Sequence, residues 1–405
     1  MAPESDTPGA PSASILDTFS KFDPNVLDSS ILDKARDLCA QYLGGAWKDI
    51  DIQQFSLRKL SGGLTNLVFC CELSPDVAIV ANEPRSVLLR IQTQSDSLQL
   101  MREIAVFMNL SANGYGPKLL AIFPGGRIEE FIPSRNPRKE EYISERYLPT
   151  IATLLAKVNN IEMPLPKSPQ YVPILRSWLE RCYKNGAQAI HLKRTAIHDD
   201  VKFPEMVTMD DIEKEFLEIQ KVLRDQKSPS VFCHNDMVPS NVLLRDPTGN
   251  GSGEQCAVEC NQIVLIDYEF GFYNYRGIEI ANTVAEFGMT YGVEEHPHYT
   301  VDLKLMEDEG LAQTFCGAYL DQLYKDHDSE EKLKIHQLTG DWDEDLKTLL
   351  LEARRFLPIQ HFFWAIWNII CVQELGDSIL DMDFSAHLKE RLIMYYHFKA
   401  NMYKF

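Results

Sequence analysis

Two short apolar runs enclose a polar loop near the middle of the chain, and this feature constrains the fold more than any other. Residues 231–233 (Val-Phe-Cys) stop at 234–236 (His-Asn-Asp), and residues 242–244 (Val-Leu-Leu) begin directly after Asn241. Asn, Asp, Pro and Ser are typical turn residues, so one interpretation is an ordinary hairpin turn. The other is that a carboxylate and a carboxamide, held between two buried strands, perform chemistry. The rest of the chain has to decide between them.

The first third of the chain has the pattern of an antiparallel sheet. Residues 31–43 have helical spacing, and Pro124-Gly125-Gly126 signals a hairpin. A helix is predicted at 98–110, with an apolar stripe formed by Leu98, Met101, Ala105 and Met108. Strands are predicted on both sides of this inserted helix, at residues 55–60, 66–72, 86–92, 118–123 and 127–132.

After residue 133 the pattern becomes largely helical. Two short strands, 242–244 and 263–266, flank a Gly- and Ser-rich surface loop. We therefore expect an α+β fold with two domains, an N-terminal lobe at 29–133 and a helical C-terminal lobe at 134–405, after a tail at 1–28. The predicted helices cover residues 147–158, 174–183, 209–223, 278–287, 311–324, 342–371 and 386–403.

Composition excludes several classes of function. The net charge of −19 over 405 residues argues against nucleic acid or an anionic membrane as partner, because both need a basic surface. The nine cysteines are scattered, which predicts reduced thiols in a cytoplasmic protein. The Pro- and Ser-rich tail is expected to be disordered and is not a signal peptide. The longest apolar run, 362–372, is interrupted by Asn368 and is too short to cross a bilayer.

Three polar residues follow one another beside buried strands. The strand at 263–266 has no polar alternation and ends at Asp267, behind Asp236 and Asn241. Taken alone, Asp267 could simply cap a strand. Phosphoryl transfer, however, needs a carboxylate to orient the attacking hydroxyl and oxygen ligands to hold Mg²⁺. The spacing D-x-x-x-x-N followed by a strand-borne Asp is typical of the catalytic and metal loops of kinases.

If this interpretation is right, the first lobe binds nucleotide. The stretch Ser61-Gly62-Gly63-Leu64-Thr65-Asn66 lies between two predicted strands, and its glycines allow close approach to a phosphate. It does not match G-x-G-x-x-G, so it is either a variant phosphate loop or a plain turn. Arg90 follows an apolar strand and is expected to contact the phosphates, tethered by Glu103 of the next helix. The alternative for Arg90 is a solvated rim position.

Further motifs point to one family. IDYEFGFYNYRG at 266–277 and HFFWAIW at 361–367, together with Asp236 and Asn241, strongly resemble choline/ethanolamine kinases. SGGLTNLVF at 61–69, residues 116–135 and the Arg90/Glu103 pair fit the same family, and the likeness covers roughly 30–405. The resemblance implies a bilobal fold like that of eukaryotic protein kinases, and ATP- and Mg²⁺-dependent phosphorylation of choline to phosphocholine for phospholipid synthesis. It also implies a homodimer.

The resemblance assigns roles to individual residues. It implies that Asp236 is the catalytic base and that Asn241 and Asp267 are Mg²⁺ ligands, with Glu269 as a helper. The backbone of Glu129, Glu130 and Phe131 would meet the adenine, and Phe270, Glu286 and Tyr291 would join Asp236 in the acceptor pocket.

Two tryptophans have the spacing that an aromatic cage requires. A quaternary ammonium has no hydrogen-bond donors and is held by aromatic faces and nearby carboxylates. Trp364 and Trp367 are three residues apart on one predicted helix, so they share a face. Core packing is the ordinary explanation for such a pair, and the family resemblance is what favours the cage.

Some positions depart from the family. Val238-Pro239-Ser240 stand where the family commonly has Gln-Glu-Gly, and Ser378-Ile379 stand near an expected acidic residue and Phe. These changes are expected to affect the affinity for the acceptor, not phosphoryl transfer. Arg276-Gly277 and Tyr291 favour choline and Phe287 favours ethanolamine, so choline is the preferred prediction, with ethanolamine as a slower or parallel substrate.

Other classes remain as alternatives. A small-molecule kinase acting on an aminoglycoside or a sugar would share the polar loop and the metal Asp without needing an aromatic cage. A kinase fold that has lost activity is suggested only by Val238-Pro239-Ser240. A protein kinase is disfavoured, because the chain has no D-F-G or A-P-E motif.

Overall fold

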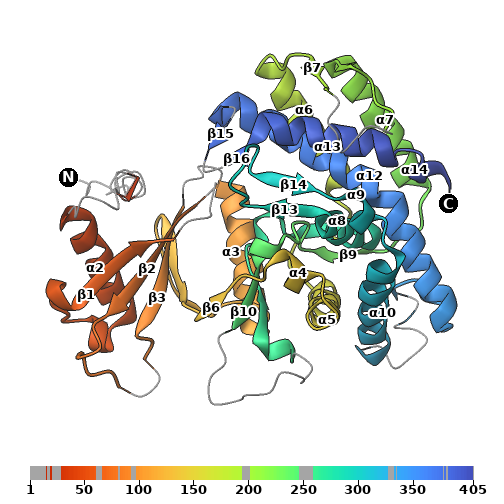
Figure 1. Cartoon of the computed structure of the whole chain (residues 1–405). Coiled ribbons are helices and arrows are strands. Elements are labelled where there is room, and N and C mark those ends of the chain that lie inside the picture. The colour runs from red at the N-terminus through yellow and green to blue at the C-terminus, as the bar shows by residue number, and fades with distance from the viewer. Residues whose placement is uncertain are drawn as a thin grey trace, which may run out of the picture. The chain divides into compact units, whose positions relative to one another are not determined.

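The computed structural model describes residues 15, 19–20, 29–60, 66–80, 83–92, 97–193, 201–245, 259–326, 333, 335–376, 378–379 and 382–404. The chain forms two compact units, Met1–Ser134 and Arg135–Phe405, which are described separately below (Figure 1). The sequence analysis placed this boundary between residues 133 and 134. Its assignment of nucleotide binding to the first unit stays a prediction.

The first unit is built on a five-stranded antiparallel sheet with the strand order β1-β2-β3-β5-β4. Helix α2 (Ser29–Leu43) precedes the sheet, and α3 (Ser97–Ala112) is inserted between β3 and β4. The predicted sheet with one inserted helix is therefore confirmed. The strands are β1 (Phe55–Lys59), β2 (Asn66–Leu73), β3 (Ser86–Gln92), β4 (Leu119–Phe123) and β5 (Gly126–Glu130).

One face of this sheet carries the core of the unit. Along β3 the buried side chains Val87, Leu89 and Ile91 alternate with less buried ones, which is the period of a strand with one covered face. The buried face packs with apolar residues of α2 such as Ile31 and Leu38. The opposite alternation places Arg90 beside Arg127 of the neighbouring strand β5.

The core includes two residues from the stretch predicted to be disordered. Ile15 and Phe19 are buried, and the Phe19 ring lies 5.1 Å from that of Phe69. Both positions lie within 1–28, where the sequence analysis expected disorder.

The apolar stripe predicted for α3 is not its buried face. Met101 and Met108 are 68% and 49% exposed, whereas Val106 and Leu110 are buried. This helix has apolar residues on more than one side, so several stripes satisfy a helical period. Periodicity alone could not select the stripe that packs.

The second unit is mainly helical, as predicted (Figure 1). Each long helix expected from the sequence is present, although the one predicted at 386–403 is broken into α13 and α14. The helices are α4 (Lys139–Tyr142), α5 (Leu148–Asn159), α6 (Tyr171–Lys184), α7 (Met209–Asp225), α8 (Arg276–Phe287), α9 (Leu303–Met306), α10 (Glu309–Asp326), α12 (Trp342–Leu375), α13 (Phe384–Phe398) and α14 (Asn401–Lys404).

Short strands join these helices, and sequence periodicity missed most of them because they have four residues or fewer. Two of the small sheets support the polar loop that follows residue 233, namely the pair β9 and β12 and the sheet with the order β11-β10-β6. The strands are β6 (Ser134–Arg135), β7 (Ile190–His191), β8 (Met206–Val207), β9 (Ser230–Cys233), β10 (Val242–Arg245), β11 (Ile263–Leu265), β12 (Phe272–Tyr275), β13 (Met289–Tyr291), β14 (Tyr299–Val301), β15 (Ser378–Ile379) and β16 (Met382–Asp383).

Helix α12 is the longest element, with 34 residues. By length and composition it could cross a membrane, but 83% of its most apolar window is buried inside the unit, as in the core helix of a globular domain. The sequence analysis predicted a helix at 342–371 but judged membrane crossing from the apolar run 362–372 alone. Arg276 at the start of α8 forms a two-pronged ion pair with Glu352 of α12, with distances of 3.0 and 2.9 Å, which fixes these helices together.

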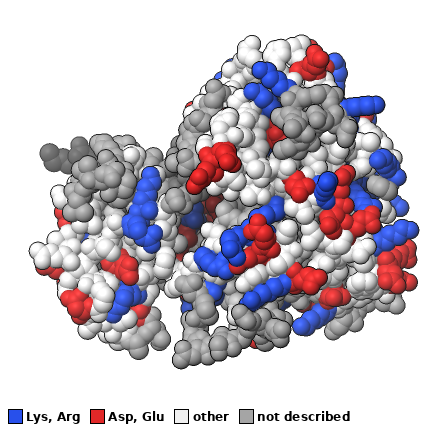
Figure 2. All heavy atoms as spheres, in the orientation of Figure 1, with Lys and Arg blue, Asp and Glu red and all other residues white. Residues whose placement is uncertain are grey.

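The charged side chains of the helical unit are distributed rather than gathered by sign. On the face shown in Figure 2, its described Lys and Arg side chains are interspersed with Asp and Glu. This distribution agrees with the acidic overall balance, and it gives that face no basic field of the kind that attracts a polyanion.

Candidate functional site

The structure brings the three polar residues of the central motif together. Strand β10 pairs with β11, with Val242 opposite Leu265, so the residue before one strand lies beside the end of the other. The backbone N–H of Ile266 donates to the carbonyl of Asn241 at 3.0 Å. The amide nitrogen of Asn241 donates to both the carbonyl and the carboxylate of Asp236, at 2.9 Å each.

The loop that carries Asp236 has an unusual backbone that is held by side chains. Asn235 has a φ of 63°, in the left-handed region that Asn tolerates better than most residues. Its amide nitrogen donates to the carbonyl of Phe270 at 2.8 Å, and its side-chain oxygen accepts from Asn274 of β12 at 2.9 Å. Asp267, on the second loop, is also left-handed, with a φ of 65°. These bonds offset the local strain and fix where both carboxylates lie.

The preceding histidine joins the two loops. The Nε2 of His234 lies 2.9 Å from the carbonyl of Ile266, so this nitrogen donates. Burial lowers the pKa of His234 to about 4, which keeps the ring neutral. His234 is therefore a structural link between the catalytic loop and the strand that ends at Asp267.

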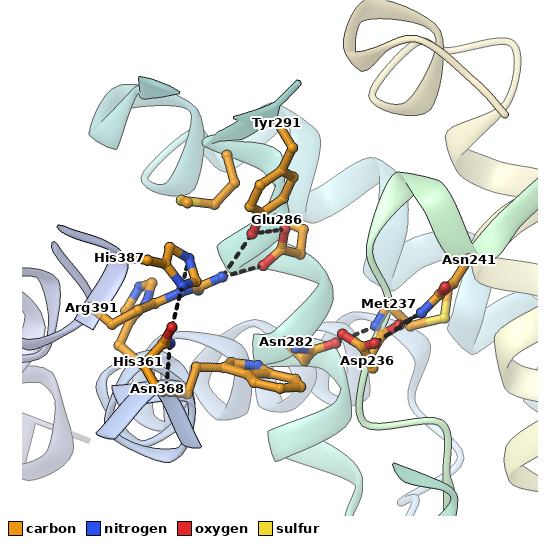
Figure 3. Close-up of polar contacts among 12 residues, drawn as sticks. Asp236, Met237, Asn241, Asn282, Glu286, Tyr291, His361, Asn368, His387 and Arg391 are labelled. Carbon is orange, nitrogen blue, oxygen red and sulfur yellow. Dashed lines mark hydrogen bonds and ion pairs between the residues drawn. The ribbon is translucent and has the colours of Figure 1, made fainter. Parts of the chain in front are cut away.

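Helix α8 supports the loop through residues that sequence analysis did not single out. The Glu279 carboxylate accepts from the backbone N–H groups of His234 and Asn235, at 2.5 and 3.1 Å. One turn further along, Asn282 accepts from the backbone N–H of Met237 at 2.6 Å (Figure 3). The available signal was a Glu between Ile278 and Ile280 in a predicted helix, because a buried Glu must be hydrogen-bonded.

The surroundings of Asp236 fit its predicted role as a base. Burial, followed by the negative charges of Glu286 and Asp267, raises the pKa of Asp236 to about 7, whereas Asn241 and Arg391 act in the opposite direction. A general base is most effective when its pKa is close to the working pH.

The side chains suited to bind a metal ion at this site are few, and their donor atoms are oxygens. Asn241 directs its amide nitrogen towards Asp236, so its oxygen points away from that carboxylate. Glu269 follows Asp267 in a short 3-10 helix, η6 (Tyr268–Phe270). Among the described residues, no group of three or more His, Cys, Asp or Glu could hold a metal ion. Mg²⁺ in nucleotide sites usually takes one or two carboxylates together with phosphate oxygens, which fits this donor set.

The first unit contains an ion-pair network around Arg90. The guanidinium Nε of Arg90 donates to Glu129 at 2.9 Å, and that of Arg127 donates to the same oxygen at 2.6 Å. Arg127 also donates to Glu103 of α3 at 2.9 Å. Although burial opposes it, Arg90 and Arg127 hold the pKa of Glu129 below its usual range. Arg127 is thus a cation that sequence analysis missed, and the helix acid Glu103 joins the network through it.

Other predicted nucleotide contacts lie at the edge of what the structure describes. Ser61, Gly62, Gly63 and Thr65 fall outside the described residues, and only the backbone of Asn66, at the start of β2, is described. Glu130 ends β5 and accepts from the backbone N–H of Lys118 at 3.0 Å, and Phe131 follows it. The assignment of these residues to ATP stays a prediction.

The predicted acceptor residues include an aromatic cluster. The ring of Trp364 lies 5.1 Å from that of Phe270 and 5.5 Å from that of Trp367, both nearly edge-on. Trp364 is only 6% exposed and belongs to the core of the unit, whereas Phe270 and Trp367 are half-buried. Phe384 of α13 also packs on Trp367, at 5.9 Å. Trp364 is therefore a core residue that also supports a half-buried aromatic surface, and the role of the pair as a cage for the acceptor stays a prediction.

Glu286 and Tyr291 form a second, polar cluster (Figure 3). Glu286 is fully buried and lies one turn beyond Asn282 on the same side of α8. One of its oxygens accepts from Arg391 at 2.8 Å and the other from the Tyr291 hydroxyl at 3.0 Å. The predicted contact of Glu286 with the acceptor stays a prediction, and both of its oxygens are already engaged within the protein.

Lys139 fixes the end of α8 that bears Glu286. Its ammonium group donates to the carbonyls of Glu286 and Met289, at 3.2 and 2.7 Å. Burial lowers the pKa of Lys139 to about 8, although Glu286 and Asp302 act to raise it.

This shift predicts a pH dependence of stability. Between pH 8 and pH 10.5 the unfolded chain binds the proton at Lys139 more strongly than the folded chain, so the free energy of unfolding should rise with pH over this window. We expect a rise on the order of 2 kcal/mol after allowing for partial exposure. Lys139→Met should lack this rise when urea unfolding is followed from pH 7.5 to pH 10. The matched control, Lys184→Met at the exposed end of α6, should keep it. Equal pH profiles for wild type and Lys139→Met would contradict it.

The departures from the family affect the loop locally. Residues 239–241 form a short 3-10 helix, η4 (Pro239–Asn241), which turns Asn241 back towards Asp236. The carbonyl of Ser240 accepts from Asn136 at 2.7 Å, so this substituted segment is still anchored. Ser378 and Ile379 lie in β15, and their side chains are outside what the structure describes.

The chain has a sheet unit with an inserted helix and a helical unit, and the helical unit carries two carboxylates and an amide on adjoining loops. This combination defines a phosphotransferase with a protein-kinase-like fold. The family model for choline/ethanolamine kinases matches residues 57–396. The chain belongs to the choline/ethanolamine kinase family.

Individual relatives agree with this assignment. The chain is 32% identical over 385 residues to choline kinase A2 of Caenorhabditis elegans, covering 91% of this chain and 85% of the relative. It is 32% identical over 378 residues to the choline/ethanolamine kinase of Homo sapiens, covering 91% and 86%. The solved choline kinase of Cryptosporidium parvum has a TM-score of 0.67 at 21% identity, covering 92% of this chain and 95% of that one, which supports the fold.

Proposed function

We propose that this protein phosphorylates the hydroxyl group of choline with ATP and Mg²⁺, forming phosphocholine and ADP in the first step of phosphatidylcholine synthesis from choline. The observation that carries the proposal is the Asp236–Asn241 contact beside Asp267, which fits a base next to oxygen ligands. The family to which the chain belongs gives this site its chemistry. The same family likeness suggests a cytoplasmic homodimer, which cell fractionation and light scattering would test.

Each residue of the catalytic set has a distinct role in this proposal. Asp236 accepts the proton of the acceptor hydroxyl as its oxygen attacks the γ-phosphorus and ADP leaves. Asn241 and Asp267 would hold Mg²⁺, whose charge stabilises the phosphates during transfer, and Glu269 would assist them. Arg90 and its network would bind ATP together with the predicted loop at 61–66.

The acceptor cation would be held by aromatic faces and by the charge of Asp236. Phe270 and Trp367 are half-buried and lie 6.5 Å apart, close to edge-on, so they present ring faces and edges from two different elements. A cation over such rings gains about 0.5–2 kcal/mol, depending on desolvation.

A substrate panel tests the proposal. Purified protein with ATP and Mg²⁺ is incubated with choline, ethanolamine, an aminoglycoside or a hexose, and formation of ADP is followed. We expect turnover of choline, weaker or parallel turnover of ethanolamine, and none of the other two. Turnover of only the aminoglycoside or the hexose would overturn the proposal, and ATP-dependent stabilisation without turnover of any acceptor would indicate a kinase fold without activity.

Ethanolamine is the second candidate acceptor. The observation that favours it is Phe287 at the end of α8, a position at which choline kinases tend to have Trp. Phe287 is fully buried and packs edge-on to Phe315 at 6.2 Å, so it acts on the acceptor only through the packing of α8. The ratio of kcat/KM for the two amines decides between them.

Trp367 offers a direct test of the aromatic surface. Trp367→Ala should raise KM for choline about tenfold, because roughly 1–2 kcal/mol of cation–π contact is lost. KM for ATP should stay unchanged. The partly exposed Trp342→Ala, at the start of α12, is the matched control. An unchanged KM for choline in Trp367→Ala would show that this residue packs in the core and does not contact the acceptor. Trp364→Ala is a less specific test of acceptor binding, because truncating a buried Trp costs about 3–5 kcal/mol of stability.

A further inference from the structure

A continuous chain of hydrogen bonds connects three of the predicted acceptor residues. It starts at the backbone carbonyl of Trp364, which accepts from Asn368 at 2.6 Å. The Asn368 side-chain oxygen lies 3.2 Å from Nδ1 of His387, and Nε2 of His387 lies 3.1 Å from Nε of Arg391. An arginine Nε can only donate, so Nε2 of His387 accepts and its Nδ1 carries the hydrogen. The direction of the whole chain is thereby fixed (Figure 3).

At the other end of this chain Arg391 engages two groups with one nitrogen. It donates to Glu286 at 2.8 Å and to the Tyr291 hydroxyl at 2.9 Å. That hydroxyl in turn donates to the second oxygen of Glu286 at 3.0 Å. A further nitrogen of Arg391 lies 3.3 Å from His361 of α12. Helices α8, α12 and α13 therefore meet at the guanidinium of Arg391.

The ion pair between Arg391 and Glu286 is buried, with 2% and 0% of the two side chains exposed. Burial first, and then the charge of Arg391, lowers the pKa of both His361 and His387, so these rings are neutral. Arg391 is the cation that compensates the Glu286 carboxylate from the side chain, while Lys139 contacts only its backbone carbonyl. Such a pair is costly to break, because the remaining charge is left buried and uncompensated.

This arrangement bears on the acceptor because Glu286 faces the same side as the catalytic loop. Glu286 and Asn282 are one turn apart on α8, and Asn282 holds the backbone of Met237, next to Asp236. A primary ammonium carries three N–H donors that require acceptors when they leave water, whereas a quaternary ammonium carries none. Each oxygen of Glu286 already accepts one hydrogen bond and Arg391 offsets its charge, so Glu286 binds a primary ammonium less well than a free carboxylate would.

We propose that Arg391 is a positioning residue that occupies the Glu286 carboxylate and thereby favours a quaternary over a primary ammonium acceptor. This inference rests on the proposed function. Its consequence is that choline is selected in part by a residue that does not touch it, from the helix α13 on the far side of Glu286.

The test compares two substrates in one variant. Arg391→Met removes the donors while keeping an unbranched side chain, and it should shift the ratio of kcat/KM for ethanolamine over choline upwards by about tenfold, the value of one hydrogen bond to a charged group. KM for ATP should not change. The matched control is Arg354→Met, whose ion pair with Glu309 lies at the surface. An unchanged ratio in Arg391→Met would overturn the proposal.

A milder variant covers the case in which Arg391→Met does not fold. Arg391→Lys keeps the positive charge but lacks the planar group that reaches Glu286, Tyr291 and His387 together. Thermal unfolding establishes that it is folded. We expect a shift of the substrate ratio in the same direction and of smaller size, and a wild-type ratio in this folded variant would count against the proposal on its own.

A double variant separates this role from general loosening of the core. If Arg391 acts through Glu286, the shift caused by Arg391→Met should disappear when Glu286→Gln is already present. The same shift in both backgrounds would overturn the proposal. Calorimetric titration with choline and with ethanolamine, without ATP, should show that Arg391→Met changes the ratio of the two affinities in the same direction as the ratio of the kcat/KM values.

The outcome also separates this inference from the proposed function. If the wild-type protein phosphorylates neither amine, the proposed function fails, whatever Arg391 does. If the wild type phosphorylates choline and the ratio is insensitive to Arg391, only the inference about Arg391 fails.

Discussion

Asp236→Ala is expected to reduce kcat for choline by a factor on the order of 10³–10⁴, while ATP still binds. In the proposed mechanism this carboxylate takes the proton of the acceptor hydroxyl, and its pKa of about 7 suits this transfer. A coupled assay for ADP gives kcat, and calorimetric titration gives the affinity for ATP. The exposed Asp225→Ala, at the end of α7, is the control for loss of an acidic side chain.

One outcome would contradict the assignment of Asp236 as the base. A near wild-type rate in Asp236→Ala would show that another group is the base. Asp236→Asn refines the test, because its amide preserves the size of the side chain and its oxygen can still accept from Asn241. A rate as low as that of the Ala variant would assign the loss to the carboxylate charge and not to the packing of the loop.

Glu279→Ala is expected to have the second largest effect, although Glu279 touches no reacting group. The change leaves two buried backbone N–H groups of the catalytic loop without their acceptor, and each unsatisfied group costs about 1–3 kcal/mol. We expect a lower unfolding midpoint and a fall in kcat of about 100-fold, since small displacements of catalytic groups are costly. Urea unfolding and the ADP assay measure the two effects.

Two further variants define the role of Glu279. Glu279→Gln keeps one oxygen acceptor and should lie between Glu279→Ala and wild type in both measurements. Glu309→Ala removes an exposed acid and should change neither. If Glu279→Ala were as active as wild type, the catalytic loop would have to be held by Asn282 and the Asn235 contacts alone.

Much of the fold could be predicted from periodicity. The strand Ser86–Gln92 was predicted with its observed bounds, and in the structure Val87, Leu89 and Ile91 alternate with less buried positions. The two-residue strands such as β7 and β15 were missed, since they contain too few residues to show any period. Burial in α3 was assigned to the wrong side for a related reason, since its sequence has more apolar residues than one face can bury.

The candidate site was predictable where chemistry lies close together in the sequence. Asp236 and Asn241 are five residues apart and meet directly, and Asp267 is brought to them by the pairing of β10 with β11. Residues that act over long separations were not predictable in this way. Arg391 and Glu286 are 105 positions apart in the sequence, and no local motif around either residue predicts their contact. Arg127 was hidden because a charged residue in a strand usually faces solvent.

One structural feature sets limits on how this protein can change. A single helix, α8, carries Glu279 and Asn282, which hold the loop of Asp236, and Glu286, the proposed acceptor residue. A substitution that shifts this helix to suit a new amine would also misalign the phosphate transfer, so such variants should be lost early in any directed evolution. New substrate ranges should therefore arise first from exchanges on α13, where a residue can alter the surroundings of Glu286 and leave the helix itself in place.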